Sequence, residues 1–117
     1  MRFEESQVNS ITVMRIVEPR LAADTAVSFR SQIIDRVTAG AQAIVLDFES
    51  VTFIDSSGIG ALVSVLKAQS NRGALALCGV QGAVAVAFRL SRMDRVFSLY
   101  GNASEAVAAL TPAHAEQ

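Results

Sequence analysis

The stretch Phe53-Ile54-Asp55-Ser56-Ser57-Gly58-Ile59-Gly60 places a carboxylate and two hydroxyls between an extended apolar segment and an amphipathic helix. Its two glycines allow another backbone to come close. In α/β sheets, functional sites tend to lie just past the carboxyl ends of the strands, at turns of this kind. We therefore take this turn as the candidate functional site. A purely structural interpretation stays open, in which Ser56 or Ser57 caps the helix and Asp55 interacts favourably with the helix dipole.

A helix is predicted after this turn and a buried strand before it. Apolar residues recur at i, i+3, i+4 and i+7 from Ile59 to Leu66, which is typical of one helix face, and Asn71-Arg72-Gly73 ends the helix. Residues 43–48 form a short apolar, β-branched run that is typical of a central strand. Residues 51–54 then continue the extended chain to the turn.

The other elements alternate in type along the chain. Strands are predicted at residues 2–7, 11–17, 75–78 and 96–99, with a hairpin turn at 8–10. Helices are predicted from a cap at Asp24 or Thr25 to Gly40, at residues 83–90, and at 104–110 with Ser104 as the cap. The predicted fold class is α/β, with one mixed, mostly parallel sheet of about five strands and four helices packed on it. The domain is expected to span residues 1–110, with residues 111–117 as a flexible tail.

Composition narrows the possible functions. Hydrophobic residues make up 51% of the 117 residues, and charged residues make up 18%, below the usual ~25%. This balance favours a sheet buried on both faces or an exposed apolar docking surface. The net charge of −1 argues against nucleic-acid binding.

The same sequence predicts a cytoplasmic chain. The uncharged stretch at residues 73–88 is shorter than the roughly 20 residues of a membrane span, so no membrane insertion is expected. The N-terminus lacks the pattern of a signal peptide. The single cysteine, Cys78, excludes an internal disulfide, fits a reducing compartment, and is predicted to be a small buried hydrophobe.

Enzymatic chemistry has little support around the candidate site. A serine hydrolase needs a histidine, and the single histidine, His114, lies in the expected tail. No Gly-Lys-Ser/Thr triplet marks a phosphate loop, and Gly58-Ile59-Gly60 is followed by Val63 where a dinucleotide fingerprint has Gly or Ala. One cysteine and one histidine are too few for a typical metal site. We therefore expect a module that is not an enzyme and needs no cofactor or metal.

Residues 53–62, which end in Gly60-Ala61-Leu62, resemble the hallmark segment of STAS domains, the anti-sigma factor antagonists of bacteria. Ile44-Val45-Leu46-Asp47-Phe48 resembles the strand that precedes this segment in the family. The C-terminal third is also similar, through Leu90-Ser91-Arg92-Met93-Asp94-Arg95-Val96-Phe97, Tyr100 and Glu105-Ala106-Val107. The resemblance covers nearly the whole chain, in order and without large insertions.

The resemblance implies a regulatory role for the turn. Ser56 corresponds to the family's phosphorylation site, with Asp55, Ser57 and Gly58 as its neighbours. The implied partners are a serine kinase of the GHKL type, which doubles as the anti-sigma factor, and a phosphatase. The unphosphorylated domain would bind the kinase and so release a sigma factor. The phosphorylated domain would dissociate from the kinase.

The expected docking surface is the beginning of the helix. Ile59, Gly60 and Val63 would contact the partner, whereas Leu62 and Leu66 are expected in the core.

One position departs from the family pattern. Many members carry an acidic residue close to the phosphorylation site where this chain has Ala22, and Asp24 could take its place. Two other functions therefore stay open. The chain could be an unphosphorylated structural subunit of a transporter or signalling complex, or a sensor that holds a nucleotide or another anion at Gly58-Ile59-Gly60. A monomer and a weak dimer are both compatible with the sequence.

Overall fold

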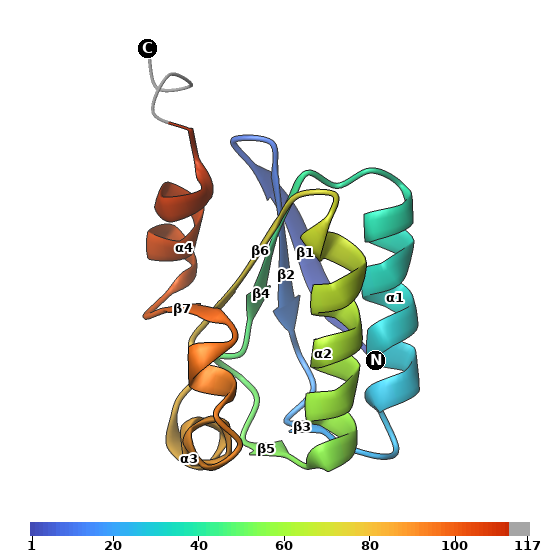
Figure 1. Ribbon diagram of the computed structural model, residues 1–117, viewed down its shortest axis with the longest axis vertical. Helices are drawn as coiled ribbons and strands as arrows, with labels where there is room; N and C mark the ends of the chain where they lie inside the picture. Colours follow the sequence, from blue (N-terminus) through green and yellow to red (C-terminus); the bar gives the residue numbers. More distant parts are fainter. Residues whose placement is uncertain (113–117) are drawn as a thin grey trace.

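The computed structural model describes residues 1–112 and contains the predicted α/β sheet (Figure 1). Five strands form one sheet in the order β1-β2-β4-β6-β7, in which β1 runs antiparallel to β2 and the other neighbours are parallel. The strands of this sheet are β1 (Phe3–Val8), β2 (Ile11–Ile16), β4 (Ala43–Asp47), β6 (Ala74–Cys78) and β7 (Ser98–Tyr100). The helices are α1 (Ala26–Thr38), α2 (Ser56–Ser70), α3 (Gly82–Leu90) and α4 (Ala103–Leu110). The predicted fold class is confirmed.

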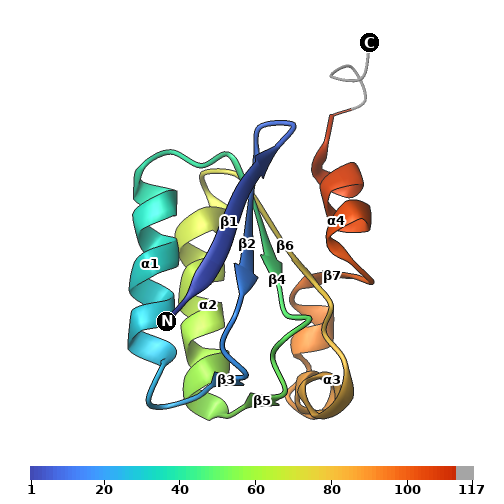
Figure 2. The same cartoon turned by 180° about the vertical axis from the view of Figure 1, so that it is seen from behind.

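The helices cover the two faces of the sheet unequally. Helices α1 and α2 lie side by side on one face, α3 lies near the carboxyl ends of the strands, and α4 lies on the opposite face (Figures 1 and 2). The first face buries the larger core, in which Phe29 of α1 and Leu62 of α2 are fully buried. The second core is smaller and lies under α4, where Val45 and Ala106 are fully buried. Strand β4 is apolar over nearly its whole length because it is covered on both faces.

A second, two-stranded sheet was not predicted from the sequence. Strand β3 (Arg20–Leu21) pairs in parallel with β5 (Phe53–Ile54), and the carbonyl of Pro19 accepts hydrogen bonds from the amides of Thr52 and Phe53. Strand β5 lies within residues 51–54, which were predicted to be extended, whereas β3 is only two residues long and carries no periodic pattern that could predict it. This pairing brings the loop before α1 against the beginning of α2, and it thereby builds the candidate site.

Most predicted boundaries differ from the observed ones by one or two residues. Helix α2 begins at Ser56, and the last strand begins at Ser98 because a 3-10 helix occupies Met93–Arg95. Helix α4 is capped by Asn102 and not by Ser104, since the Asn102 side chain accepts a hydrogen bond from the amide of Glu105 at 2.9 Å. The predicted hairpin turn is present, with positive φ at Asn9 and Ser10. Residues 113–117 of the predicted tail, including His114, lie outside the described residues.

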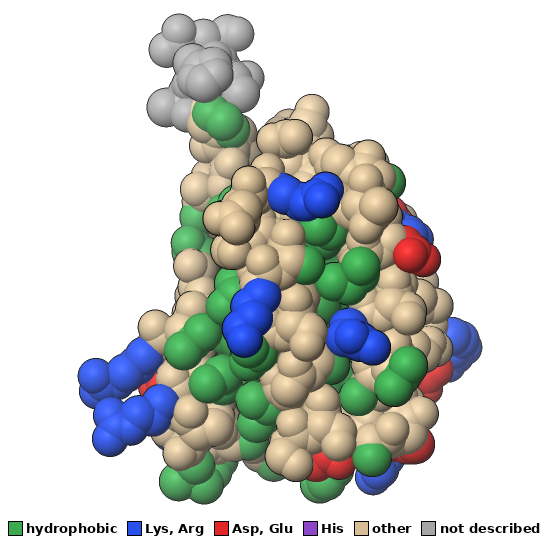
Figure 3. Space-filling model, turned by 45° about the vertical axis from the view of Figure 1, so that its right-hand side comes forward, with side chains coloured by type: hydrophobic (Ala, Val, Ile, Leu, Met, Phe, Trp, Pro, Cys, Tyr) green, Lys and Arg blue, Asp and Glu red, His purple; other side chains and the backbone are tan. Residues whose placement is uncertain are grey.

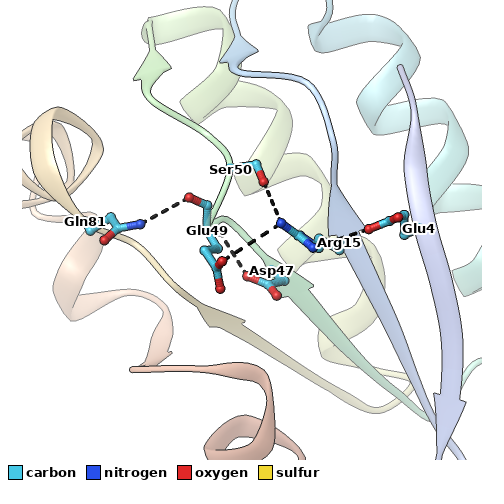
Figure 4. Close-up of polar contacts among 6 residues, drawn as sticks. All are labelled: Glu4, Arg15, Asp47, Glu49, Ser50 and Gln81. Carbon is cyan, nitrogen blue, oxygen red and sulfur yellow. Dashed lines mark hydrogen bonds and ion pairs between the residues drawn. The ribbon is translucent and has the colours of Figure 1, made fainter.

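A polar cluster lies at the carboxyl ends of β2 and β4 (Figure 4). Arg15 donates hydrogen bonds to Glu4 on β1 and to Ser50 in the loop after β4. Asp47, at the end of β4, accepts a hydrogen bond from the amide of Glu49 at 3.0 Å. The cluster therefore ties the edge strand to the loop that leads toward the candidate site.

Among residues 1–112, no helix is both long enough and apolar enough to cross a bilayer.

Cys78 is fully buried beside this cluster, as predicted. Burial, the charge of Asp47, a hydrogen bond with Asp47 and the charge of Glu49 raise the pKa of the Cys78 thiol to about 12. A thiol with so high a pKa carries almost no reactive thiolate near neutral pH.

We expect Cys78 to be inert in the folded protein. A colorimetric thiol reagent should leave the native chain unlabelled at mildly alkaline pH and should label one thiol per chain in strong denaturant, because only unfolding exposes the sulfur and removes Asp47. Labelling of the native protein at the rate of the unfolded chain would contradict this placement.

Candidate functional site

Asp55 is the residue that holds the candidate site together. Its backbone is extended, with φ −117° and ψ −174°, and its side chain caps α2 by accepting a hydrogen bond from the amide of Gly58 at 3.0 Å. The other carboxylate oxygen accepts a hydrogen bond from the amide of Ala23 at 3.1 Å. The structural interpretation in which a serine caps the helix is therefore wrong. One carboxylate bridges the first turn of α2 and the loop before α1.

The surroundings of Asp55 favour its charged form. The hydrogen bond from the Gly58 amide has the largest effect and lowers the pKa of the Asp55 carboxyl, and the amides of Ala23 and Ser57 and the charge of Arg20 lower it further. Partial desolvation opposes these effects without reversing them. The turn therefore carries a fixed negative charge near neutral pH.

Both serine hydroxyls are left free by this cap. Ser56 and Ser57 are exposed, and among residues 1–112 neither side chain forms a hydrogen bond. Because Asp55 satisfies the first turn of α2, neither serine is needed to stabilise the helix. The arrangement presents two hydroxyls to solvent beside a carboxylate.

The two glycines of the turn have different reasons to be there. A Cβ at Gly58 would collide with the carbonyl oxygen of Leu21 and would lie 2.8 Å from Cγ1 of Ile54, so the approach of β3 requires glycine. A Cβ at Gly60 would meet nothing within 4 Å. Gly60 is exposed within a helix that it weakens. Packing inside the chain therefore explains Gly58 and does not explain Gly60.

The remaining predicted site residues divide between surface and core. Ile59 and Val63 are partly exposed and Gly60 is exposed, so all three reach the surface of α2. Leu62 is fully buried, as expected. Leu66 is only partly buried and packs against the core from its edge.

The loop before α1 holds the substituted position. Ala22 is buried, with 1% of its surface exposed, so a longer side chain has no open space there. Thr25 occupies the N-cap position of α1 but forms no cap bond, and its hydroxyl instead accepts from the amide of Ala22 and donates to the carbonyl of Arg20. Asp24 pairs with Arg20 at 3.6 Å and is well exposed.

Arg20 and Ala23 are contributors that sequence analysis missed. The Arg20 guanidinium lies 5.0 Å from the centre of the Phe53 ring and also acts on the charge of Asp55. Ala23 contributes only a backbone amide, which no side-chain pattern can reveal. An arginine three residues before an alanine carries no motif, so only the pairing of β3 with β5 identifies these positions.

The two glycines allow a matched comparison of stability. We expect Gly58→Ala to lower the free energy of unfolding by about 1–3 kcal/mol, because the new methyl group collides with the backbone of Leu21. Gly60→Ala should raise it by about 0.5–1 kcal/mol, because alanine favours the helix and meets open space. Urea unfolding of both variants measures the difference. Equal changes in the free energy of unfolding from the two substitutions would mean that β3 does not lie in close contact with α2 at Gly58.

Acid titration tests the charge of Asp55. Because the folded-state pKa is lowered, the stabilisation by the carboxylate is fully present above the ordinary value of 3.8 and is lost as the pH falls through the folded pKa. Asp55→Asn keeps an oxygen acceptor but never carries the charge. The stability difference between wild type and Asp55→Asn should stay constant above that value and shrink in more acid solution, as followed by chemical unfolding. Ser56→Ala serves as a control, and a difference that grows with acid would refute the assignment.

Known proteins share this fold. The family model for the STAS domain matches residues 2–106. A putative anti-sigma factor antagonist from Thermotoga maritima, known from a crystal structure, is 26% identical in sequence to this chain. The match covers 94% of this chain and 95% of the Thermotoga chain, with a TM-score of 0.85. The Bacillus cell fate determinant SpoIIAA in its phosphorylated form is 21% identical over 92% of this chain and 98% of its own, with a TM-score of 0.68.

A protein with a different role also has this fold. A sulfate transporter family protein from Wolinella succinogenes is 17% identical over 90% of this chain and 88% of its own, with a TM-score of 0.76. At this identity the likeness concerns the fold alone. The family match spans the sheet, the four helices up to the middle of α4, and the Asp55 turn, and on this ground the chain belongs to the STAS domain family.

Proposed function

We propose that this protein is an anti-sigma factor antagonist that is switched by phosphorylation of Ser56. In the unphosphorylated state it binds a cognate anti-sigma serine kinase of the GHKL type in the cytoplasm and so releases a sigma factor. Phosphorylation ends this binding, and a phosphatase restores it. The observation that carries the proposal is the exposed, unbonded hydroxyl of Ser56 at the first residue of α2, beside the fixed carboxylate of Asp55.

The proposed function needs binding and no catalysis by this chain. The partner would dock on the beginning of α2, where Gly60 is exposed and Ile59 and Val63 are partly exposed. Open space at Gly60 supports this surface, because a glycine that weakens a helix is useful where another protein must approach the backbone. Asp24, next to Ala23 in the loop before α1, would lie at the edge of the same surface.

The sign of the electrostatics indicates where the switch acts. A phosphoserine carries about −1.5 to −2 charges at neutral pH. At the beginning of a helix that charge is favoured by the helix dipole, and the nearby charge of Asp55 opposes the gain. Phosphorylation should therefore leave the fold intact. It acts at the interface, where a docking partner must desolvate the phosphate, and a tenfold loss of affinity needs only about 1.4 kcal/mol.

A second candidate function is that of a structural subunit in a transporter or signalling complex. One observation favours it, which is the buried Ala22 at the position where many family members have an acid. The sulfate transporter family protein shows only that the same fold occurs in a protein of that class. In that case Ser56 would never be modified, and an ATPase or membrane subunit would co-purify in place of a kinase.

The geometry offers less support to a third function, that of an anion sensor. The Gly58 amide in the first turn of α2, which would hold an anion, already donates to the carboxylate of Asp55. That carboxylate is ionised near neutral pH and would repel a nucleotide phosphate.

Phosphorylation by the cognate kinase tests the proposal. Incubation with ATP and the kinase should add one phosphate to the wild-type chain and to Ser57→Ala, and none to Ser56→Ala, as read by intact mass and peptide mapping. Ser56→Asp should unfold at nearly the wild-type temperature and bind the kinase more weakly, since it places a charge at an exposed position. Modification of Ser57 with Ser56 untouched would overturn the assignment of the site.

A further inference from the structure

A shallow crease runs between α1 and α2 from the candidate site. It has a volume of about 250 Å³. Its residues come from one face of each helix and the loop before α1, and they are Ala23, Ala26, Val27, Arg30, Ser57, Ala61 and Ser64. Most of these side chains are small, so the surface stays hollow where the helices meet. Because Ser57 lines the crease and Ser56 is its neighbour, the crease opens directly beside the proposed phosphorylation site.

The rim of the crease combines apolar surface with unpaired positive charge. Val27 is 67% exposed, which is high for a valine in a folded domain. Arg30 is exposed, and so is Lys67, which follows Ser64 by three residues on α2. Among residues 1–112 neither cation forms an ion pair. Figure 3 shows Lys and Arg side chains and green apolar surface in the middle of this face, with acidic side chains toward its edges.

Acidic groups are scarce around the crease. Helix α2 contains no Asp or Glu, and α1 has no acidic residue in its first turn. Asp24, just before α1, is already paired with Arg20. Asp55 directs both carboxylate oxygens to backbone amides. The positive charge of Arg30 and Lys67 is therefore available to a group from outside the chain.

We propose that this crease receives an acidic segment of the kinase partner, with an aliphatic side chain against Val27 and Ala61 and a carboxylate on Arg30. This inference rests on the proposed function and specifies the chemistry of the partner. It commits to a protein segment because the crease offers both apolar surface and an exposed cation, and because it continues the surface that begins at Ser56.

An acidic segment in the crease also gives a reason for the switch. Ser57 lines the crease and Ser56 precedes it directly, so a phosphate on Ser56 would lie beside the bound segment. Charges in physiological salt act on each other over a screening length of ~8 Å. The phosphate dianion and the partner carboxylate would repel each other at that range. Binding would then be lost through repulsion across the interface, without any change in the fold.

Charge reversal at the crease tests the inference. Binding of the unphosphorylated chain to the kinase that modifies Ser56 would be measured by calorimetry for wild type, Arg30→Glu, Arg30→Lys and Arg72→Glu. Arg72→Glu is the matched control, because Arg72 is also exposed and unpaired among the described residues but lies past the far end of the 15-residue α2, ~22 Å along the helix. Thermal unfolding would establish that all four chains are folded.

The expected result is a loss of affinity of about tenfold or more for Arg30→Glu, near wild-type affinity for Arg30→Lys and Arg72→Glu, and a salt dependence that weakens in Arg30→Glu. If the kinase modifies Ser56 and binds wild type and Arg30→Glu equally, the crease assignment is overturned while the proposed function stands. If no kinase binds or modifies the chain, both fall. Two further results would assign the crease to another occupant and overturn the inference: self-association of the chain alone that Arg30→Glu abolishes, or binding to anionic phosphatidylserine vesicles that requires Arg30.

Discussion

The Asp55 carboxylate is the contact on which the organisation of the site depends. Its two oxygens accept hydrogen bonds from the Gly58 amide and from the Ala23 amide, so one side chain joins two segments that are distant in sequence. The pairing of β3 with β5 brings these segments together, and the missing side chain of Gly58 allows the close approach. The order of the turn is thus set by the pairing of β3 with β5 and by the bonds of Asp55, and the side chains of the exposed serines form no hydrogen bond among the described residues.

The exposed residues of the turn are not needed for the stability of the fold, so they can be modified. The core on the α1 and α2 face stabilises the fold, and the contacts of Asp55 stabilise the turn. The side chains of Ser56 and Ser57 and the open position at Gly60 face solvent and make no contact that the fold requires. A residue with no structural duty can gain a charge at little cost to stability. The physical requirement for a switch, a stable scaffold under a chemically changeable surface, is met at this turn.

The sequence predicted what depends on periodic patterns and missed what depends on isolated backbone contacts. The apolar run of β4 and the helical spacing of Ile59 to Leu66 indicated the α/β sheet and its longest helix, and both are present. Strand β3 is two residues long and has no pattern, so the contribution of Ala23 was invisible. The choice of Asp55 over Ser56 as the cap could not be made in advance, because aspartate and serine are equally good capping residues and only the position of the first helical residue separates them.

The cap at Asp55 has a consequence for how an enzyme could recognise this serine. An isolated peptide of the same residues would lack β3, the Ala23 amide and the packed helix, and a segment of this length does not form a stable helix in water. The carboxylate and the hydroxyl would then point in many relative directions. A modifying enzyme that reads their fixed arrangement would have to read a folded surface in three dimensions, and it would ignore unfolded or nascent copies of the chain.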